Sequence, residues 1–293
     1  MKIKFWGVRG SIPSPGPNTQ RYGGNTTCIE VRTDDNDLII LDGGTGIFTF
    51  AQQLVKELPI TAHIFNTHSH WDHIQGLPFF IPIFIPGNTI HLYGAFDPIS
   101  GAGPERIMNI QMQYSYFPVR EAEMRSRIHY VTVMPHETIK IAGTIITPTL
   151  LSHPVVNLGY RIDCNGKSMF FTGDHEPHYN IYEPGEDGYN DYQALIEEQR
   201  LSIEVAMKDV DVLIADSSYT QSEYPSKKGW GHGTFDSCIE MAKAAGAKML
   251  YCTHHEPTRS DDDLEKVFAE AVARHDCRNL DVRLAREGDE IVI

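Results

Sequence analysis

The sequence contains only five cysteines, and they are widely scattered at Cys28, Cys164, Cys238, Cys252 and Cys277. No two of them stand at C-x-x-C spacing, so a cysteine-based metal site is unsupported. Unpaired thiols of this kind are typical of a reducing compartment. The stretch "MKIKFWGVRG" at the amino terminus lacks the apolar core of a signal peptide, which predicts a cytoplasmic location.

Long apolar runs are also missing. The longest, "LPFFIPIFIPG", is short and interrupted by prolines, so we expect no membrane span. Basic residues are outnumbered, with 25 Lys and Arg against 39 Asp and Glu, and the net charge is −14. This charge disfavours nucleic acid as the main partner, because binding a polyanion needs clustered Lys and Arg. The negative net charge is compatible with a small anionic substrate that is held by bound cations.

Strand-like stretches open both halves of the chain and alternate with helical ones. Strand patterns lie near residues 2–8, 26–33, 37–44, 61–67, 89–94, 138–151, 157–174 (a hairpin with its turn at Asn165 and Gly166), 210–220, 248–257 and 281–293. Helical spacing is expected near residues 46–58, 104–127, 195–209, 234–247 and 260–275, the last with Ser260 as its N-cap, and 182–192 is expected as a surface loop. Two similar β-rich halves with covering helices predict an α/β fold in one domain, residues 1–293, with two sheets packed face to face and helices outside.

The stretch "FNTHSHWDHIQG" places three histidines and an aspartate directly after a buried strand. On such a loop His68 and His70 can point the same way, while Asp72 and His73 turn to a neighbouring position. This pattern predicts two adjacent cation sites. The alternative, a polar turn with solvated histidines, does not explain the H-x-H-x-D-H spacing.

A pair of cations needs more ligands than these four. His153 in "TLLSHPV", Asp174 in "FFTGDHE" and His254 in "LYCTHHEP" each follow an apolar run of strand type. Ligands at the carboxyl ends of strands face a common edge, so we expect these three side chains to join the cluster.

In order and spacing, "LDGGTG", "HSHWDH", His153, "FTGD" and "THH" resemble the motifs of the metallo-β-lactamase superfamily over nearly the whole chain. The resemblance implies a four-layer αβ/βα sandwich with a dinuclear site at one edge. It also implies one metal held by His68, His70 and His153, a second held by Asp72, His73 and His254, and Asp174 bridging the two. His255 is an alternative to its neighbour His254.

A pair of divalent cations can clamp a phosphoryl group and lower the pKa of a bridging water, which then attacks phosphorus as hydroxide. Imidazole and carboxylate ligands favour zinc, with manganese and iron left open. Outer partners should fix the imidazole tautomers. We expect Asp42 in "LDGG" to be one of them, since it ends a neighbouring strand; a turn-forming aspartate before glycine is the alternative.

By the same resemblance, Asp174 at the bridging position implies phosphodiester or thioester cleavage, because family members that open lactams tend to lack this residue. The stretch from "LIADSSYT" to "YCTHH" resembles the phosphodiesterase branch, which includes transfer-RNA 3′-processing nucleases and cyclic-phosphate phosphodiesterases. By this resemblance Asp216 pairs with His232, and His232 protonates the leaving oxygen. Gly233 and the shorter acid Asp216 depart from the branch's pattern. Asp72, Asp174, Asp216 and His232 thus form the expected catalytic set.

The chain has no basic, glycine-rich arm of the kind that grips transfer RNA, so we expect a small substrate. The opening "WGVRGSIPSPGPNTQRYGGNTTCIEV" resembles a bacterial branch of cyclic nucleotide and phosphoribosyl cyclic phosphate phosphodiesterases, which implies a small cyclic phosphate or cyclic nucleotide as substrate. Arg9 and Ser11 are candidates for the mouth of the site. An ordinary turn explains Arg9 and Ser11 equally well. Tyr114, Tyr116 and Phe117 are candidates for a lid that stacks on a base, although aromatic residues in such a pattern more often belong to the core. Homodimers are common in the branch and are compatible with this sequence.

Two other functions remain open at this point. Thioester hydrolysis of the glyoxalase type uses the same ligands, but gives Asp216 and His232 no evident role. A non-hydrolytic di-iron redox or sensing module usually carries an appended flavin domain, for which 293 residues leave no room.

Overall fold

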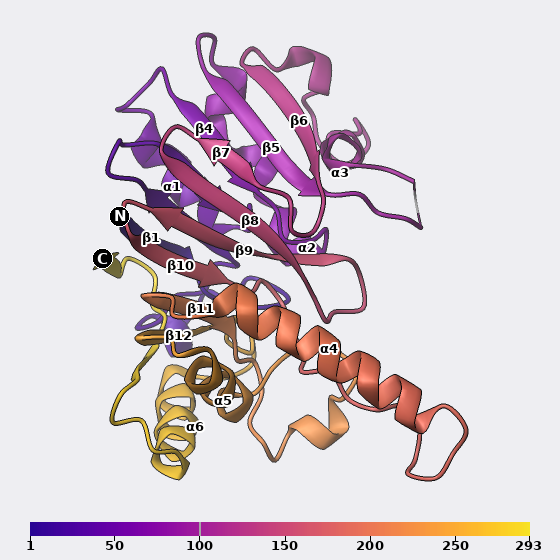
Figure 1. Cartoon of the computed structure of the whole chain (residues 1–293). Helices are drawn as coiled ribbons and strands as arrows, with labels where there is room; N and C mark the ends of the chain where they lie inside the picture. Colours follow the sequence, from indigo (N-terminus) through magenta and orange to yellow (C-terminus); the bar gives the residue numbers. More distant parts are fainter. Residues whose placement is uncertain (100) are drawn as a thin grey trace.

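Two seven-stranded sheets face each other in the computed structural model, which describes residues 1–99 and 101–293 (Figure 1). The first sheet has the order β14-β1-β2-β3-β4-β5-β6, and the second has the order β13-β12-β11-β10-β9-β8-β7. The strands are β1 (Lys2–Gly7), β2 (Cys28–Arg32), β3 (Leu38–Leu41), β4 (Thr61–Phe65), β5 (Thr89–Ala95), β6 (Arg127–Val133), β7 (Ile139–Ile141), β8 (Thr144–Leu151), β9 (Asn157–Cys164), β10 (Lys167–Phe171), β11 (Val212–Asp216), β12 (Met249–Thr253), β13 (Asp281–Leu284) and β14 (Glu290–Val292).

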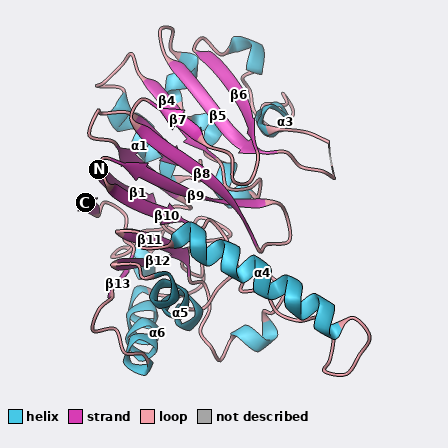
Figure 2. Ribbon diagram, in the orientation of Figure 1, coloured by secondary structure: helices cyan, strands magenta, loops and turns pink. Residues whose placement is uncertain are grey.

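Helices cover the outer face of each sheet, as Figure 2 shows for the helices coloured cyan. They are α1 (Gly46–Leu54), α2 (Trp71–Ile74), α3 (Pro104–Gln111), α4 (Tyr189–Met207), α5 (Phe235–Ala245) and α6 (Asp261–Arg274). Short 3₁₀ turns lie at Pro17–Thr19, Leu77–Phe79, Ile81–Phe84, Glu121–Glu123 and Tyr224–Ser226. The predicted α/β sandwich of two mixed sheets with helices outside is therefore confirmed.

Three separate apolar cores hold these four layers together. The central core lies between the sheets and joins residues such as Phe65 from the first sheet to Tyr160 and Phe171 from the second. A second core packs α1 and its neighbours on the first sheet, and a third packs α4, α5 and α6 on the second. Strand β11 is buried on both faces, and successive side chains point to opposite faces. Val212 therefore belongs to the central core and Leu213 to the outer core.

Most of the predicted elements are present, with differences at three places. Ser260 caps α6 by accepting a hydrogen bond from the Asp263 backbone N–H. The helix expected over 104–127 ends at Gln111, and the chain continues through turns to Pro118, before which helical backbone is disfavoured. Strand β6 begins at Arg127 and was missing from the prediction, and the loop expected to reach residue 192 ends where α4 begins, at Tyr189.

The parallel strands decide where the functional residues gather. Strands β3 to β6 pair in parallel in the first sheet, and β10 to β13 do so in the second. Their carboxyl ends lie at one edge of the sandwich, and the loops that leave them meet there. No helix in the described part of the chain is long and apolar enough to span a membrane.

A ladder of histidines crosses three of these strands. His63, His91 and His129 are in register on β4, β5 and β6, and their rings stack at centroid distances of 4.6 and 4.8 Å. Burial, and then the neighbouring His91, lower the pKa of His63 from 6.5 to about 4. The folded chain therefore holds His63 neutral at pH values where the unfolded chain protonates it.

We expect the lowered pKa of His63 to reduce the free energy of unfolding in acid. The contribution of His63 is complete above pH 6.5 and is lost as the pH falls from 6.5 towards 4. Between pH 7 and pH 5, the free energy of unfolding of the His63→Phe variant should fall less than that of the wild type, by about 1 kcal/mol after allowance for the partial exposure of the ring. Urea denaturation of EDTA-treated protein measures this, and equal losses for the two chains would contradict it.

Candidate active site

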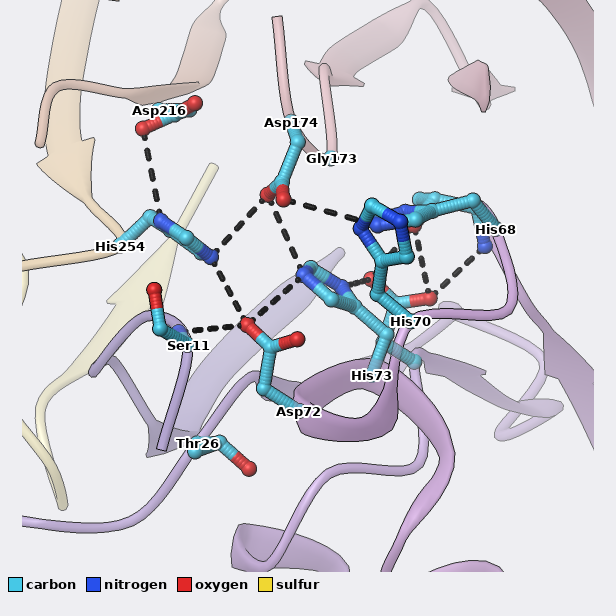
Figure 3. Close-up of polar contacts among 12 residues, drawn as sticks. Ser11, Thr26, His68, His70, Asp72, His73, Gly173, Asp174, Asp216 and His254 are labelled. Carbon is cyan, nitrogen blue, oxygen red and sulfur yellow. Dashed lines mark hydrogen bonds and ion pairs between the residues drawn. The ribbon is translucent and has the colours of Figure 1, made fainter. Parts of the chain in front are cut away.

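Strand ends from both sheets bring the predicted residues together at one edge of the sandwich (Figure 3). The loop after β4 supplies His68 and His70, and the short helix α2 that follows supplies Asp72 and His73. His153 follows β8, Asp174 follows β10, and His254 follows β12. Side chains from four strand ends thus share one site, although they span 187 positions of the chain.

The first of two clusters contains His68, His70, His153 and Asp174, whose ligand atoms lie within 4.8 Å of one another. The Nε2 atom of His153 lies 3.1 Å from His70 Nδ1, and His68 Nε2 lies 3.5 Å from Asp174 Oδ2. All four side chains direct a nitrogen or oxygen atom at a common centre.

The second cluster contains Asp72, His73, Asp174 and His254, again within 4.8 Å. The Oδ1 atom of Asp174 lies 3.2 Å from both His73 Nε2 and His254 Nε2. Its Oδ2 atom faces the first cluster, so one carboxylate contacts both groups. The backbone N–H of Ser11 donates to Asp72 Oδ2 at 2.7 Å and closes this side of the site.

The structure distinguishes between the two neighbouring histidines His254 and His255. His254 points into the second cluster, whereas His255 lies away from it, with its Nε2 atom 2.8 Å from the Ala285 carbonyl oxygen. The backbone of His254 has a φ of 58°, a left-handed conformation that costs a non-glycine residue about 1–2 kcal/mol. The strain separates the directions of the two side chains.

Two buried side chains orient two of the imidazoles from outside. Asp42 Oδ2 lies 2.8 Å from His73 Nδ1, which agrees with its expected role as an outer partner. Asp42 also accepts hydrogen bonds from the backbone and the hydroxyl of Thr67. Ser218 Oγ lies 2.9 Å from His254 Nδ1, a contact that was not predicted from the sequence. Each partner occupies Nδ1 and leaves Nε2 free to face the cluster.

Glycine is required where the strands of the two sheets approach most closely. Gly173 has a φ of 59°, and a Cβ atom there would lie 2.7 Å from the side chain of Thr67. Any side chain would force β10 away from the loop after β4. Gly173 thus sets the distance at which Asp174 reaches the histidines.

The protonation of the site follows from burial and charge. Burial lowers the pKa of His68, His70 and His153, which favours the neutral imidazoles that a metal requires. Burial also acts on His73 and His254, but the carboxylates of Asp174 and its neighbours outweigh it and raise the pKa of both. The second cluster therefore attracts positive charge, whether it comes from a proton or from a metal ion.

Several buried atoms of these clusters lack a hydrogen bond. His68 Nε2, His73 Nε2 and Asp174 Oδ1 are buried and have no hydrogen-bond partner among residues 1–99 and 101–293. Buried polar atoms without a partner are rare because they lose hydration without compensation. Imidazole nitrogens and carboxylate oxygens are the donors that divalent zinc takes, so the two clusters fit a pair of divalent cations.

The predicted Asp216 and His232 pair lies beside the second cluster. His232 Nδ1 is 2.9 Å from Asp216 Oδ2 and 3.7 Å from Asp174 Oδ2. Burial alone lowers the pKa of His232, but Asp216 and Asp174 outweigh it and raise the pKa to about 9. The imidazole is thus protonated at neutral pH in the metal-free chain. The shorter side chain of Asp216 does not prevent the pairing.

Glu176 orders the loop that carries His232, a role that the sequence did not indicate. Its buried carboxylate accepts hydrogen bonds from the backbone N–H groups of Gly229 and Gly231 and from the hydroxyl of Tyr224. The carbonyl oxygen of Gly231 lies 2.9 Å from His153 Nδ1. One carboxylate therefore fixes the loop that carries His232 and orients His153.

The structure corrects the expectation for Arg9. Its side chain is fully buried and pairs with Asp261 and with backbone carbonyl oxygens. It therefore does not line the mouth of the site. Ser11 does lie at the site, but the contact is made by its backbone. Tyr114 and Tyr116 are 68% and 75% exposed, in the turns after α3.

Replacing Glu176 with glutamine should loosen the loop. Glutamine keeps the shape but presents an amide N–H to donors, so the free energy of unfolding should fall by about 1–3 kcal/mol. Trypsin should also cut faster after Lys227 and Lys228, which lie in this loop. Glu198→Gln, on the exposed face of α4, is the matched control and should change neither measurement. Unchanged stability and cleavage in the Glu176 variant would contradict the role.

Comparison with known proteins places this geometry in a family. Residues 38–255 match the β-lactamase superfamily domain. Ribonuclease Z of Staphylococcus aureus (strain MSSA476) is 22% identical over 307 residues, an alignment that covers 95% of this chain and 96% of the relative.

Two solved structures share the fold at lower identity. YhfI from Bacillus subtilis, a metallo-β-lactamase fold protein, has a TM-score of 0.67 at 18% identity and covers 99% of this chain and 98% of its own. A diphosphatase of the PhnP family has a TM-score of 0.63 at 19% identity and covers 100% and 97%. The expectation that the chain is a metal-dependent hydrolase is confirmed by its family. The chain belongs to the metallo-β-lactamase superfamily.

Proposed function

We propose that the chain is a dinuclear metal-dependent phosphodiesterase that hydrolyses a small cyclic phosphate or cyclic nucleotide. One observation carries the proposal: the carboxylate of Asp174 contacts imidazoles of both clusters, with Oδ2 facing His68 and Oδ1 facing His73 and His254. A carboxylate in this position can share its two oxygens between two cations.

The proposed ligands are those of the two clusters. His68, His70 and His153 would hold one cation, Asp72, His73 and His254 the other, and Asp174 both. Zinc is our first choice because of the imidazole and carboxylate donors, with manganese or iron as substitutes. When bound, two such cations neutralise charge on phosphoryl oxygens and lower the pKa of a water molecule so that it can act as nucleophile.

His232 is the proposed proton donor to the leaving oxygen. Its Nδ1–H donates to Asp216, which orients the ring and favours the imidazolium form. Its side chain is 12% exposed, so the ring keeps some contact with solvent beside the clusters. General-acid catalysis of this kind contributes about 10²- to 10⁴-fold to the rate.

Phosphodiester chemistry is favoured over thioester hydrolysis by two observations. The relatives reported above include a ribonuclease and a diphosphatase, both of which act on phosphorus–oxygen bonds. The Asp216–His232 pair also has a role only where the leaving group needs a proton. The net charge of −14 supports a small substrate over a nucleic acid. A cytoplasmic location and a homodimer stay predictions of the sequence.

Replacing Asp174 with alanine tests the proposal. The variant should lose hydrolysis of bis(p-nitrophenyl) phosphate and should bind fewer than two metal ions per chain, measured by elemental analysis after dialysis, because both clusters lose a ligand. Asp187→Ala, in an exposed loop, is the control and should match the wild type. Full activity of the Asp174 variant, or faster hydrolysis of a glutathione thioester than of any phosphodiester by the wild type, would sink the proposal.

Replacing His232 with alanine tests the proton donor separately. An alkoxide leaving group needs a proton, whereas p-nitrophenolate leaves readily without one. The variant should therefore lose about 10²- to 10⁴-fold in kcat on adenosine 3′,5′-cyclic phosphate and less than tenfold on bis(p-nitrophenyl) phosphate. Equal losses on the two substrates would argue that His232 supports the site without donating a proton.

A further inference from the structure

A cleft of about 480 Å³ opens directly beside the first cluster. It lies between α3 and the segment 154–156, and His68 and Ser69 form its end at the metal site. Its walls are largely apolar, with Ile107 and Ile110 of α3 facing Pro154 and its neighbours. A ligand whose phosphate sits at the clusters would extend into this space.

Two amide side chains in the lining have buried atoms without a partner. Gln111 is 7% exposed and Asn66 is 1% exposed. Gln111 Nε2 and Asn66 Oδ1 have no hydrogen-bond partner within residues 1–99 and 101–293. The Nδ2 atom of Asn66 is satisfied by the His73 carbonyl oxygen at 3.3 Å. A buried polar atom in an apolar wall is unfavourable unless a ligand pairs with it.

An exposed aromatic ring and a single cation complete the lining. Trp71, the first residue of α2, is 65% exposed and belongs to the lining of the cleft. Arg106 is the one arginine or lysine among the described lining residues. An aromatic face can stack on a flat ring, and an amide can pair with its edge.

We infer that this cleft binds the nucleobase of the substrate, with Trp71 as the stacking face and Gln111 as the hydrogen-bonding partner. The inference rests on the proposed phosphodiesterase function and specifies its substrate as a nucleotide. An acyl chain would leave the two amides unpaired, and a sugar would find too few polar groups on these walls. The volume suits one nucleoside and not a polymer. The unpaired donor Nε2 of Gln111 and the unpaired acceptor Oδ1 of Asn66 match a ring nitrogen and the exocyclic amino group of adenine, so adenine is the expected base.

Gln111→Leu and its matched control Gln113→Leu test this. Gln113 is exposed two residues further along and does not line the cleft. We expect Gln111→Leu to lower kcat/KM on adenosine 3′,5′-cyclic phosphate about tenfold, mainly through KM, and to leave bis(p-nitrophenyl) phosphate within twofold. Gln113→Leu should change neither. Equal effects of Gln111→Leu on both substrates, or no effect on either, would overturn the inference.

Binding of free nucleosides provides a measurement that does not depend on activity. In isothermal titration of EDTA-treated protein, the wild type should bind adenosine, and Gln111→Leu should bind it about tenfold more weakly while unfolding at the same or a higher temperature. A leucine at a buried position with an unpaired amide should not destabilise the fold. Guanosine, cytidine and uridine identify the preferred base, and binding of none of the four would overturn the inference.

The two proposals fail in different ways. If the wild type hydrolyses no phosphodiester with zinc, manganese or iron, the proposed function is wrong, whereas adenosine binding and its dependence on Gln111 still decide the assignment of the cleft. If bis(p-nitrophenyl) phosphate is hydrolysed but no nucleoside binds, the function stands and the assignment of the cleft is wrong.

Discussion

The contact between one buried carboxylate and the imidazoles around it determines how this molecule is put together. Asp174 follows β10 of the second sheet, whereas His68 and His73 lie in the loop and the short helix α2 that follow β4 of the first. Their approach requires the two sheets to meet closely at that edge, which the absence of a side chain at Gly173 permits. Concentrating carboxylates and imidazoles there is costly without cations, so the same contact that joins the sheets also creates the demand for metal.

That demand links folding to metal binding. The carboxylates of Asp72 and Asp174 raise the pKa of His73 and His254, so protons occupy the second cluster when metal is scarce. Protons and metal ions thus compete for the same nitrogen atoms, and the competition becomes stronger as the pH falls. The outer partners Asp42 and Ser218 hold the rings of His73 and His254 with Nε2 facing the cluster.

Features that depend on a local pattern of residues could be predicted from the sequence. Contacts between segments far apart in the chain could not. Apolar runs such as that of β11 identify strands buried on both faces, and residues at their carboxyl ends, such as Asp174 and His254, could be assigned to one edge. Glu176 and Ser218 were missed because their partners are backbone groups and side chains 36 to 55 positions away, which no spacing reveals. The prediction for Arg9 was wrong because its partner Asp261 lies far away in the sequence. In the sequence alone, a buried arginine near a turn cannot be distinguished from an exposed one.

Helix α3 has a consequence for how such a protein changes over time. It belongs to the connection between β5 and β6, which supplies no residue of the two clusters. A substitution in this connection alters the wall of the cleft without shifting His153, Asp174 or His254. The amide of Gln111, proposed to pair with the base, thus lies on a different part of the chain from the residues of the clusters, so the choice of base can diverge between descendants while the clusters stay intact.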